Sequence, residues 1–427
     1  MDFFSIFIEP FNNDMFRQTI QVLESTWSVW LPIISGYIFL SLWLNYIRTD
    51  YIQKQGSVLL ELRLPADVLN SPKGMEIFFT QIYQTGSATE IDTFWHGKIR
   101  PWWSLEYVSL EGEIHIYVWC QAKWKNLVEA QLYAQYHQIE IYEAKDPMSW
   151  VYHDPVGLPM WATYYKFTKD DVYPIKTYID YGLDKEQEEE FKVDPLTALF
   201  EFLGSLRKGE WSWIQIVIQA HKEEKFKDAR MFLRKDWKEA AEKEVRKIRE
   251  TAAEYSAKEI ANVQKRMGTK DARSPFPTVL LSKGQEQVIT ALERSIDKFP
   301  FEAVVRGMYV AKRESFQSVS INGLIGCVRQ FSSNVLNGFK LGWFTDFDYP
   351  WEDWHRIRRN VAERSMLKSF KMRSVFHPPY KNFHVEPMIL NTEELATMFH
   401  IPGRVAATPT LPRIPAKKVE APPNIPT

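Results

Sequence analysis

An uncharged run of 23 residues, Ser25 to Ile47, constrains this chain more than any other stretch. About 20 apolar residues in a helix cross the roughly 30 Å hydrocarbon core of a bilayer, so the run is long enough to span one. Aromatic rings that favour the headgroup level lie toward its two ends, at Trp27, Trp30, Trp43 and Tyr46. We therefore expect a transmembrane helix at 25–47; the alternative is a buried core helix.

Basic residues are more frequent after this run than before it. Residues 1–24 contain only Arg17, whereas residues 48–73 contain Arg48, Lys54, Arg63 and Lys73. Because the more basic flank stays in the cytoplasm, we expect a single-pass protein of the cell membrane with a cytoplasmic body. A cleaved signal peptide is not expected, since the run is too long and no small-residue cleavage site follows it.

Residues 1–24 are expected to form an amphipathic N-terminal segment. Phenylalanine and isoleucine crowd residues 3–11, and Phe16, Ile20 and Leu23 recur at helical spacing. Such a segment either lies on the outer face of the membrane or extends the spanning helix.

The remaining composition is that of a folded body. Hydrophobic residues make up 45% of the chain, and the net charge of −1 creates no overall field that attracts nucleic acid. The two cysteines, Cys120 and Cys327, lie in apolar surroundings, so we expect buried, reduced thiols and no disulfide framework.

The fold class expected for the body is α+β, built from two modules. Residues 56–147 predict the order βαββαβ, which is typical of a ferredoxin-like module with an antiparallel sheet. Its strands are expected at 58–64, 104–110, 113–120 and 139–142, and its helices from Ser71 and over 124–132. Glu111-Gly112 predicts a hairpin turn between the second and third strands. Residues 148–313 predict a second, looser copy, with strands at 160–168, 211–219 and 300–311 and helices at 195–206 and 283–298.

A charged insertion, residues 222–270, interrupts the second module. It carries a thin apolar stripe at Phe226, Phe232, Leu233, Trp237, Ala241, Val245, Ile248 and Ala252. The spacing near 3.5 predicts a long helix or a helical hairpin of coiled-coil character. The stripe packs either on a partner or on its own domain.

Residues 314–401 predict a mainly helical region that contains a basic stretch. Arg356, Arg358, Arg359, Lys368 and Lys371 lie there together with Trp351, Trp354 and Phe370. Cations beside aromatic rings can contact phosphates and stack on bases, so these five residues are candidates for nucleic-acid contact. The alternative is a solvated or salt-bridged helix face.

The C-terminal residues 402–427 include seven prolines and predict an extended, semi-rigid tail or linker without fixed structure of its own beyond about Thr408.

Motifs for chemistry are missing from the sequence. No Gly-Lys-Ser or Gly-Lys-Thr ends a phosphate-binding loop, the nine histidines have no metal-ligand spacing, and no nucleophile elbow occurs. The sequence therefore assigns no catalytic residue, cofactor or metal, and it does not argue for an enzyme.

Three stretches carry a resemblance to a known family: LLELRLP at 59–65, EGEIHIYVWCQAKWKNLVEAQLYAQY at 111–136 and NTEELATMFHIP at 391–402. They resemble the N-terminal, membrane-anchored region of bacterial ATPases of the HerA and conjugative coupling-protein type, found in type IV secretion-like systems. The resemblance covers roughly residues 50–427 and rests on structural motifs, not on catalytic ones. It implies a transmembrane segment, α+β modules and a proline-rich joint that leads into a motor domain.

The motor itself has no counterpart, because the chain stops where it would begin. The resemblance implies that Glu394, Leu395, His400 and Pro402 dock a partner, a motor ATPase encoded separately. We therefore expect a non-catalytic, membrane-anchored subunit or the split N-terminal half of such an ATPase, in a DNA-transfer or secretion-like system. The alternative is an independent tethered module that binds nucleic acid or protein. Either can form a homo-oligomer.

This topology makes a testable prediction. A protease added outside intact cells should spare all residues beyond about 50, because the basic flank holds them in the cytoplasm. Immunoblotting against the body after protease treatment measures this, with cells lysed before treatment as the control. Removal of the body in intact cells would reverse the orientation.

Overall fold

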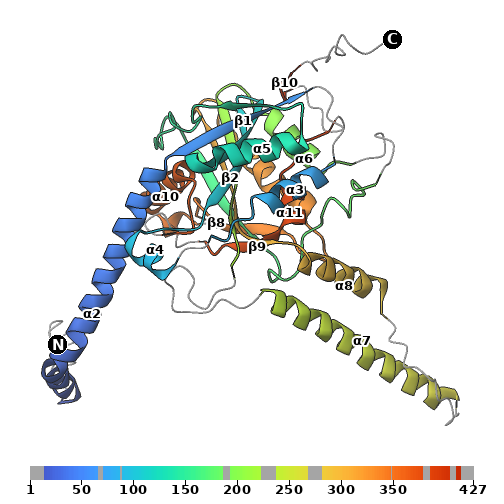
Figure 1. The fold of residues 1–427 in the computed structure, drawn as a ribbon, viewed down its shortest axis with the longest axis horizontal. Coiled ribbons are helices and arrows are strands. Elements are labelled where there is room, and N and C mark those ends of the chain that lie inside the picture. Colours follow the sequence, from blue (N-terminus) through green and yellow to red (C-terminus); the bar gives the residue numbers. More distant parts are fainter. Residues whose placement is uncertain are drawn as a thin grey trace. The chain divides into compact units, whose positions relative to one another are not determined.

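The computed structural model describes residues 14–65, 71–86, 89–185, 193–222, 237–267, 281–347, 349–377, 385–403 and 410–414 (Figure 1). Its chain divides into two units. The first comprises residues 1–54 and 88–98, and the second, called the body below, comprises residues 55–87 and 99–427.

The first unit is built on one long helix, α2 (Asp14–Gln55), of 42 residues. Within the described residues, its stretch Glu24–Gln55 is the one helix long and apolar enough to cross a membrane, and its most apolar window is not buried at all. Ile33, Phe39 and Leu42 each expose about two thirds of their surface. The expected apolar helix is thus present, and it is continuous with residues 14–24. Residues 1–13 of the predicted amphipathic segment lie outside the described residues.

The body is organised around a single sheet of ten strands. The strands are β1 (Ser57–Pro65), β2 (Trp102–Leu110), β3 (Glu113–Gln121), β4 (Glu140–Glu143), β5 (Met160–Phe167), β6 (Glu210–Ala220), β7 (Pro300–Ala311), β8 (Phe339–Phe344), β9 (Met388–Asn391) and β10 (Arg413–Ile414). Their order is β10-β1-β3-β2-β6-β7-β5-β8, with β4 also pairing with β1 and β9 with β7. All pairs are antiparallel except β1 with β10. The α+β class is therefore confirmed.

The strands predicted from alternation are all present, but the two predicted modules do not form separate sheets. They join through β2 and β6, which pair along their length from Trp102 opposite Gln219 to Leu110 opposite Trp211. The region predicted to be mainly helical also supplies two strands, β8 and β9. Sequence periodicity missed both because β9 has four residues and β8 contains Gly342.

The turn between β2 and β3 was predicted at Glu111-Gly112, and the structure confirms it. Both residues have positive φ, 57° and 93°. A two-residue hairpin turn of this hand requires positive φ at both positions, which is why glycine is suited to the second. A side chain at Gly112 would also collide with the carbonyl oxygen of Leu206, 2.6 Å from the position of its Cβ.

Alternation along the strands separates two faces of the sheet. Leu105 and Tyr107 join the main hydrophobic core, whereas Glu106 between them points to the other face. Five helices pack on the first of these faces and contribute side chains to the main core: α3 (Lys73–Gln81), α5 (Lys125–Gln135), α6 (Leu196–Gly204), α9 (Ser318–Gly326) and α11 (Thr392–Met398). The opposite face carries α10 (Ile357–Met372) (Figure 1).

The charged insertion forms α7 (Trp237–Met267), followed by α8 (Lys283–Ile296). Val245 of the predicted stripe packs on Val288, Ile289 and Leu292 of α8, with Ile248 beside them. This part of the stripe therefore packs on its own domain. Phe226, Phe232 and Leu233 lie outside the described residues.

Both cysteines are free and buried, as predicted. Burial raises the pKa of each thiol to about 12, so neither ionises near neutral pH.

Part of the proline-rich tail is ordered against the body, contrary to the expectation for residues beyond Thr408. The Thr410 carbonyl accepts a hydrogen bond from the Ile114 N–H at 3.1 Å, and Leu411 enters the main core. β10 then adds to the sheet beside Leu64 and Pro65. The chain here completes a sheet edge and a core.

The buried tail residue leads to a stability prediction. Leu411→Ala should lower the free energy of unfolding of the detergent-solubilised chain by about 2 to 5 kcal/mol, because it opens a cavity in the core. Urea titration measures this change. Leu281→Ala, at a partly exposed position, is the matched control and should change it by no more than about 0.5 kcal/mol. If Leu411→Ala changed the free energy of unfolding as little as Leu281→Ala does, the tail would contribute nothing to the core.

Candidate functional site

The basic stretch forms α10, a helix with one buried and one exposed side. Its inner side consists of Ala362, Glu363, Met366, Leu367, Ser369 and Phe370. Its first turn is capped by Asp353, whose carboxylate accepts the N–H groups of Arg358 and Arg359 at 3.0 and 2.8 Å. The residues of α10 that lie between these buried positions face outward.

We define the α10 outer surface as Trp351, Trp354, Ile357, Val361, Arg364 and Lys368. The last four recur at intervals of four, three and four residues, so they form one row along the helix. Trp354 exposes 80% of its surface, Trp351 70%, and Ile357 and Val361 63% each. A surface of this kind, with large apolar side chains beside cations, is typical of an interaction site.

The five predicted nucleic-acid contacts do not all share this surface. Arg356, Arg358 and Lys368 are exposed, and Lys371 is half-buried. Arg359 is turned inward, where its guanidinium pairs with Glu363 at 2.9 Å and Asp346 at 2.8 Å. The prediction missed Ile357 and Val361, whose spacing of four residues beside Trp354 was the available signal.

A row of polar side chains crosses the sheet beneath α10. Glu106 on β2 lies opposite Gln215 on β6, which lies opposite Arg306 on β7. The Gln215 amide donates to Glu106 at 3.0 Å and accepts from Arg306 at 2.9 Å. All three are buried, so every charge in the row needs a partner.

α10 supplies those partners. The Arg306 guanidinium donates to the hydroxyl and carbonyl of Ser369 at 2.7 and 2.9 Å and lies over the Phe370 ring at 4.6 Å. Arg373, just past the helix, pairs with Glu106 at 2.5 Å and Asp146 at 2.7 Å. Burial alone would lower the pKa of Arg373, but these two carboxylates outweigh it and raise the pKa. The C-terminal half of α10 is therefore fixed to the sheet.

The middle of α10 is held by a second polar contact. His153 Nε2 lies 3.0 Å from the Glu363 carboxylate, and the Arg364 Nε donates to His153 Nδ1 at 3.3 Å. With Nε2 protonated and Nδ1 accepting, both contacts are satisfied by one tautomer of the ring. His153 thus holds the middle of α10 through Glu363 and Arg364.

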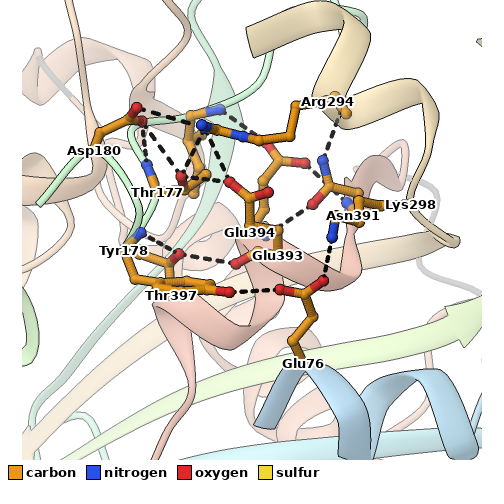
Figure 2. A network of polar contacts seen from close by, with 12 residues as sticks. Glu76, Thr177, Tyr178, Asp180, Arg294, Lys298, Asn391, Glu393, Glu394 and Thr397 are labelled. Atoms are coloured by element: carbon orange, nitrogen blue, oxygen red, sulfur yellow. Dashed lines mark hydrogen bonds and ion pairs between the residues drawn. The ribbon is translucent and has the colours of Figure 1, made fainter. Parts of the chain in front are cut away.

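The motif predicted to dock a partner lies in a different place, around α11. Figure 2 shows side chains from three other segments converging on this helix: Glu76 of α3, Thr177, Tyr178 and Asp180 of the loop after β5, and Arg294 and Lys298 at the end of α8. Asn391 caps α11, and its backbone N–H donates to Glu394 at 2.8 Å in return. The Glu394 carboxylate also accepts the Ile175 N–H at 2.8 Å.

All four residues of the predicted docking motif are buried. Leu395 lies in the main core, and Pro402 follows the buried Ile401. His400 places Nε2 at 3.2 Å from Asp194 and Nδ1 at 2.9 Å from the Ala396 carbonyl. Burial acts to raise the pKa of Asp194, but the charge and hydrogen bond of His400 outweigh it and lower the pKa. These residues therefore hold α11 in the body and present no surface to a partner.

A cavity of about 980 Å³ lies beside β5, β8 and β9. Its polar lining includes Lys166, Lys169, Asp170, Asp171 and Glu386, with Trp237 of α7 at one side. In the described part of the chain, no three His, Cys, Asp or Glu side chains gather closely enough to hold a metal ion. The residues that line this cavity do not point to a particular reaction or ligand.

No protein-family model matches this sequence, and no curated protein matches it significantly. The resemblance to membrane-anchored ATPase regions therefore remains a hypothesis.

The buried Glu394 yields a pH prediction. Burial raises the pKa of this carboxyl from its ordinary 4.5 to about 8, so the folded state holds the proton more tightly than the unfolded chain. The resulting stabilisation is complete below about pH 4.5 and is lost as the pH rises to about 8. Glu394→Gln cannot titrate, so the difference in melting temperature between the parent and this variant should shrink from pH 5 to pH 8. Thermal unfolding of the two proteins over this range measures it; a constant difference would show that Glu394 is already ionised at pH 5.

Proposed function

We propose that this chain is a non-catalytic, membrane-anchored subunit that docks a separate motor ATPase in a DNA-transfer or secretion-like system, through the α10 outer surface. The observation that carries the proposal is the exposure of Ile357 and Val361 on α10, and of Trp354 just before it, on a helix whose inner side is fixed by buried charges. Tryptophan and arginine are the residues that most often dominate protein interfaces. A rigid support lowers the cost of ordering them on binding.

The anchor in this proposal is α2. Its apolar stretch has the length of a membrane span, and the side chains of its most apolar window are not buried in the described structure. The basic residues that follow favour a cytoplasmic body. A cytoplasmic motor partner would then meet the body on the same side of the membrane.

We also infer that the body contains two ferredoxin-like halves. The first half has the strand order β4-β1-β3-β2, and the second has β8-β5-β7-β6. Numbered within each half, both orders are 4-1-3-2. The same permutation in both halves supports a repeated plan, interrupted in the second by α7 and α8.

The α10 outer surface is a better docking surface than the motif at Glu394 to Pro402, because that motif is buried. Its cations complement an acidic partner patch, and its indole rings can fill pockets there. In this proposal the motif has a structural role, because its residues hold α11 in the body just before the proline-rich tail.

The rival function, nucleic-acid binding, uses the same helix but different atoms. Phosphate contacts depend on cations and weaken steeply with salt, whereas a protein interface depends on the apolar side chains. With Arg359 already paired, the exposed cations of the predicted set are Arg356, Arg358 and Lys368, with Lys371 half-exposed. Few phosphate contacts give only weak, non-specific affinity.

The experiment places a photo-crosslinking amino acid at Trp354 of the full chain in its native membrane. The control is the same amino acid at Tyr133, a partly exposed aromatic position on α5. A crosslink from position 354 to a protein with a nucleotide-hydrolysing motor, absent from position 133, is the expected result. A second arm replaces Ile357 and Val361 by Ser, which should abolish this crosslink, and Arg358 and Lys368 by Gln, which should only weaken it. Crosslinking to nucleic acid, or loss only in the Gln variant, would overturn the proposal.

A further inference from the structure

A short helix of the first unit, α4 (Glu90–Trp95), exposes large apolar side chains that the described residues do not cover. Ile91 and Trp95 expose 65% and 66% of their surfaces. The helix is well defined, because Thr89 and Asp92 form a reciprocal capping box at its start. Its two exposed residues are one turn apart and lie on the same side.

Three contacts fix α4 on α2, within the same unit. The Trp43 indole N–H donates to the Phe94 carbonyl at 2.8 Å. The rings of Trp43 and Trp95 meet edge to face with centroids 6.0 Å apart. Gly97 then lies so close to the backbone at Ile47 that a Cβ would be 2.5 Å from that carbonyl oxygen, and its φ of +63° also favours glycine.

These contacts set the depth of α4 along α2. The uncharged run ends at Ile47, and Trp43 lies four residues earlier, about 6 Å along the helix axis. The end of a spanning helix meets the boundary between acyl chains and headgroups, which is the level that tryptophan favours. α4 therefore lies at that boundary if α2 crosses the bilayer.

The chemistry of α4 fits this level. The Trp43 ring contacts three other aromatic rings, those of Phe39, Tyr46 and Trp95, with centroid distances of 6.4, 6.3 and 6.0 Å. The same segment carries Asp92 and Lys98, whose charged atoms are 3.8 Å apart. An element that combines exposed apolar side chains with paired charges is suited to lie at the boundary between acyl chains and headgroups.

We propose that residues 89–98 are an interfacial anchor, which inserts Ile91 and Trp95 among the lipids of the leaflet at the Ile47 end of the uncharged run, beside Trp43. The proposal rests on the membrane anchoring by α2 in the proposed function. The residues that flank this segment in sequence belong to the body. An inserted α4 thus gives the chain a second contact with the bilayer, in addition to α2.

The test exploits the chain's two cysteines, which are buried and have raised pKa values, so that a thiol reagent reacts selectively with a new surface cysteine. The full chain is reconstituted into vesicles of phosphatidylcholine and phosphatidylglycerol, with and without lipids that carry a nitroxide quencher on the acyl chain. Three variants each receive an environment-sensitive fluorophore: Ile91→Cys in α4, Leu42→Cys in α2 and Tyr133→Cys in α5.

We expect the quencher lipids to reduce emission at position 91 to an extent similar to that at position 42, with no loss at position 133. Quenching at 42 without quenching at 91 would overturn the anchor while leaving the span in place. Blue-shifted but unquenched emission at 91 would indicate a protein neighbour, such as a second copy of the chain, and would also overturn the anchor. Absence of quenching at position 42 would overturn the span and the anchor together.

Discussion

The pairing of β2 with β6 is the interaction on which the body depends. It aligns strands from two halves of the chain over nine residue pairs and makes one sheet of them. A slip of one residue would exchange the two faces of β6, placing Gln215 in the hydrophobic core and Ile214 and Ile216 under α10. The register therefore decides at once which side chains form the core and which support the exposed helix.

The buried charges make this register specific. Glu106, Gln215 and Arg306 meet only when β2, β6 and β7 are aligned, and Arg373 and Asp146 complete the network. Buried ion pairs contribute little net stability because of their desolvation, but an unpartnered buried charge is strongly unfavourable, by about 3 to 5 kcal/mol. The network thus penalises other registers more than it stabilises the native one, and it holds the inner side of α10 in place.

Three elements of the described chain, α2, α4 and α10, expose groups of large apolar side chains, and the groups are suited to partners of different chemistry. On α2 the exposed side chains form a continuous apolar run with the length of a bilayer core. On α4 they are Ile91 and Trp95, seated on α2 near the end of that run. On α10 they are Ile357 and Val361, followed along the same row by the exposed cations Arg364 and Lys368, on a helix that the sheet supports. We propose lipid as the partner of the first two and a protein with an acidic patch as the partner of the third.

The sequence by itself determined the local elements: the apolar helix from its uncharged run, the strands from alternation such as Ile114, Ile116 and Val118, and the β2–β3 turn from Glu111-Gly112. These signals are local, because helix, strand and turn preferences act over a few residues. Tertiary structure alone decided that the two halves share a sheet, that the motif at Glu394 to Pro402 is buried, and that tail residues 410–414 pack on the body. It also separated Arg358 and Arg373, two arginines at the two ends of one basic stretch, into an exposed side chain and a buried ion pair. The reason is that burial depends on contacts between distant segments: Gln215 and Arg373, which both contact Glu106, are 109 and 267 residues from it in sequence. Local spacing does not indicate which distant segments meet.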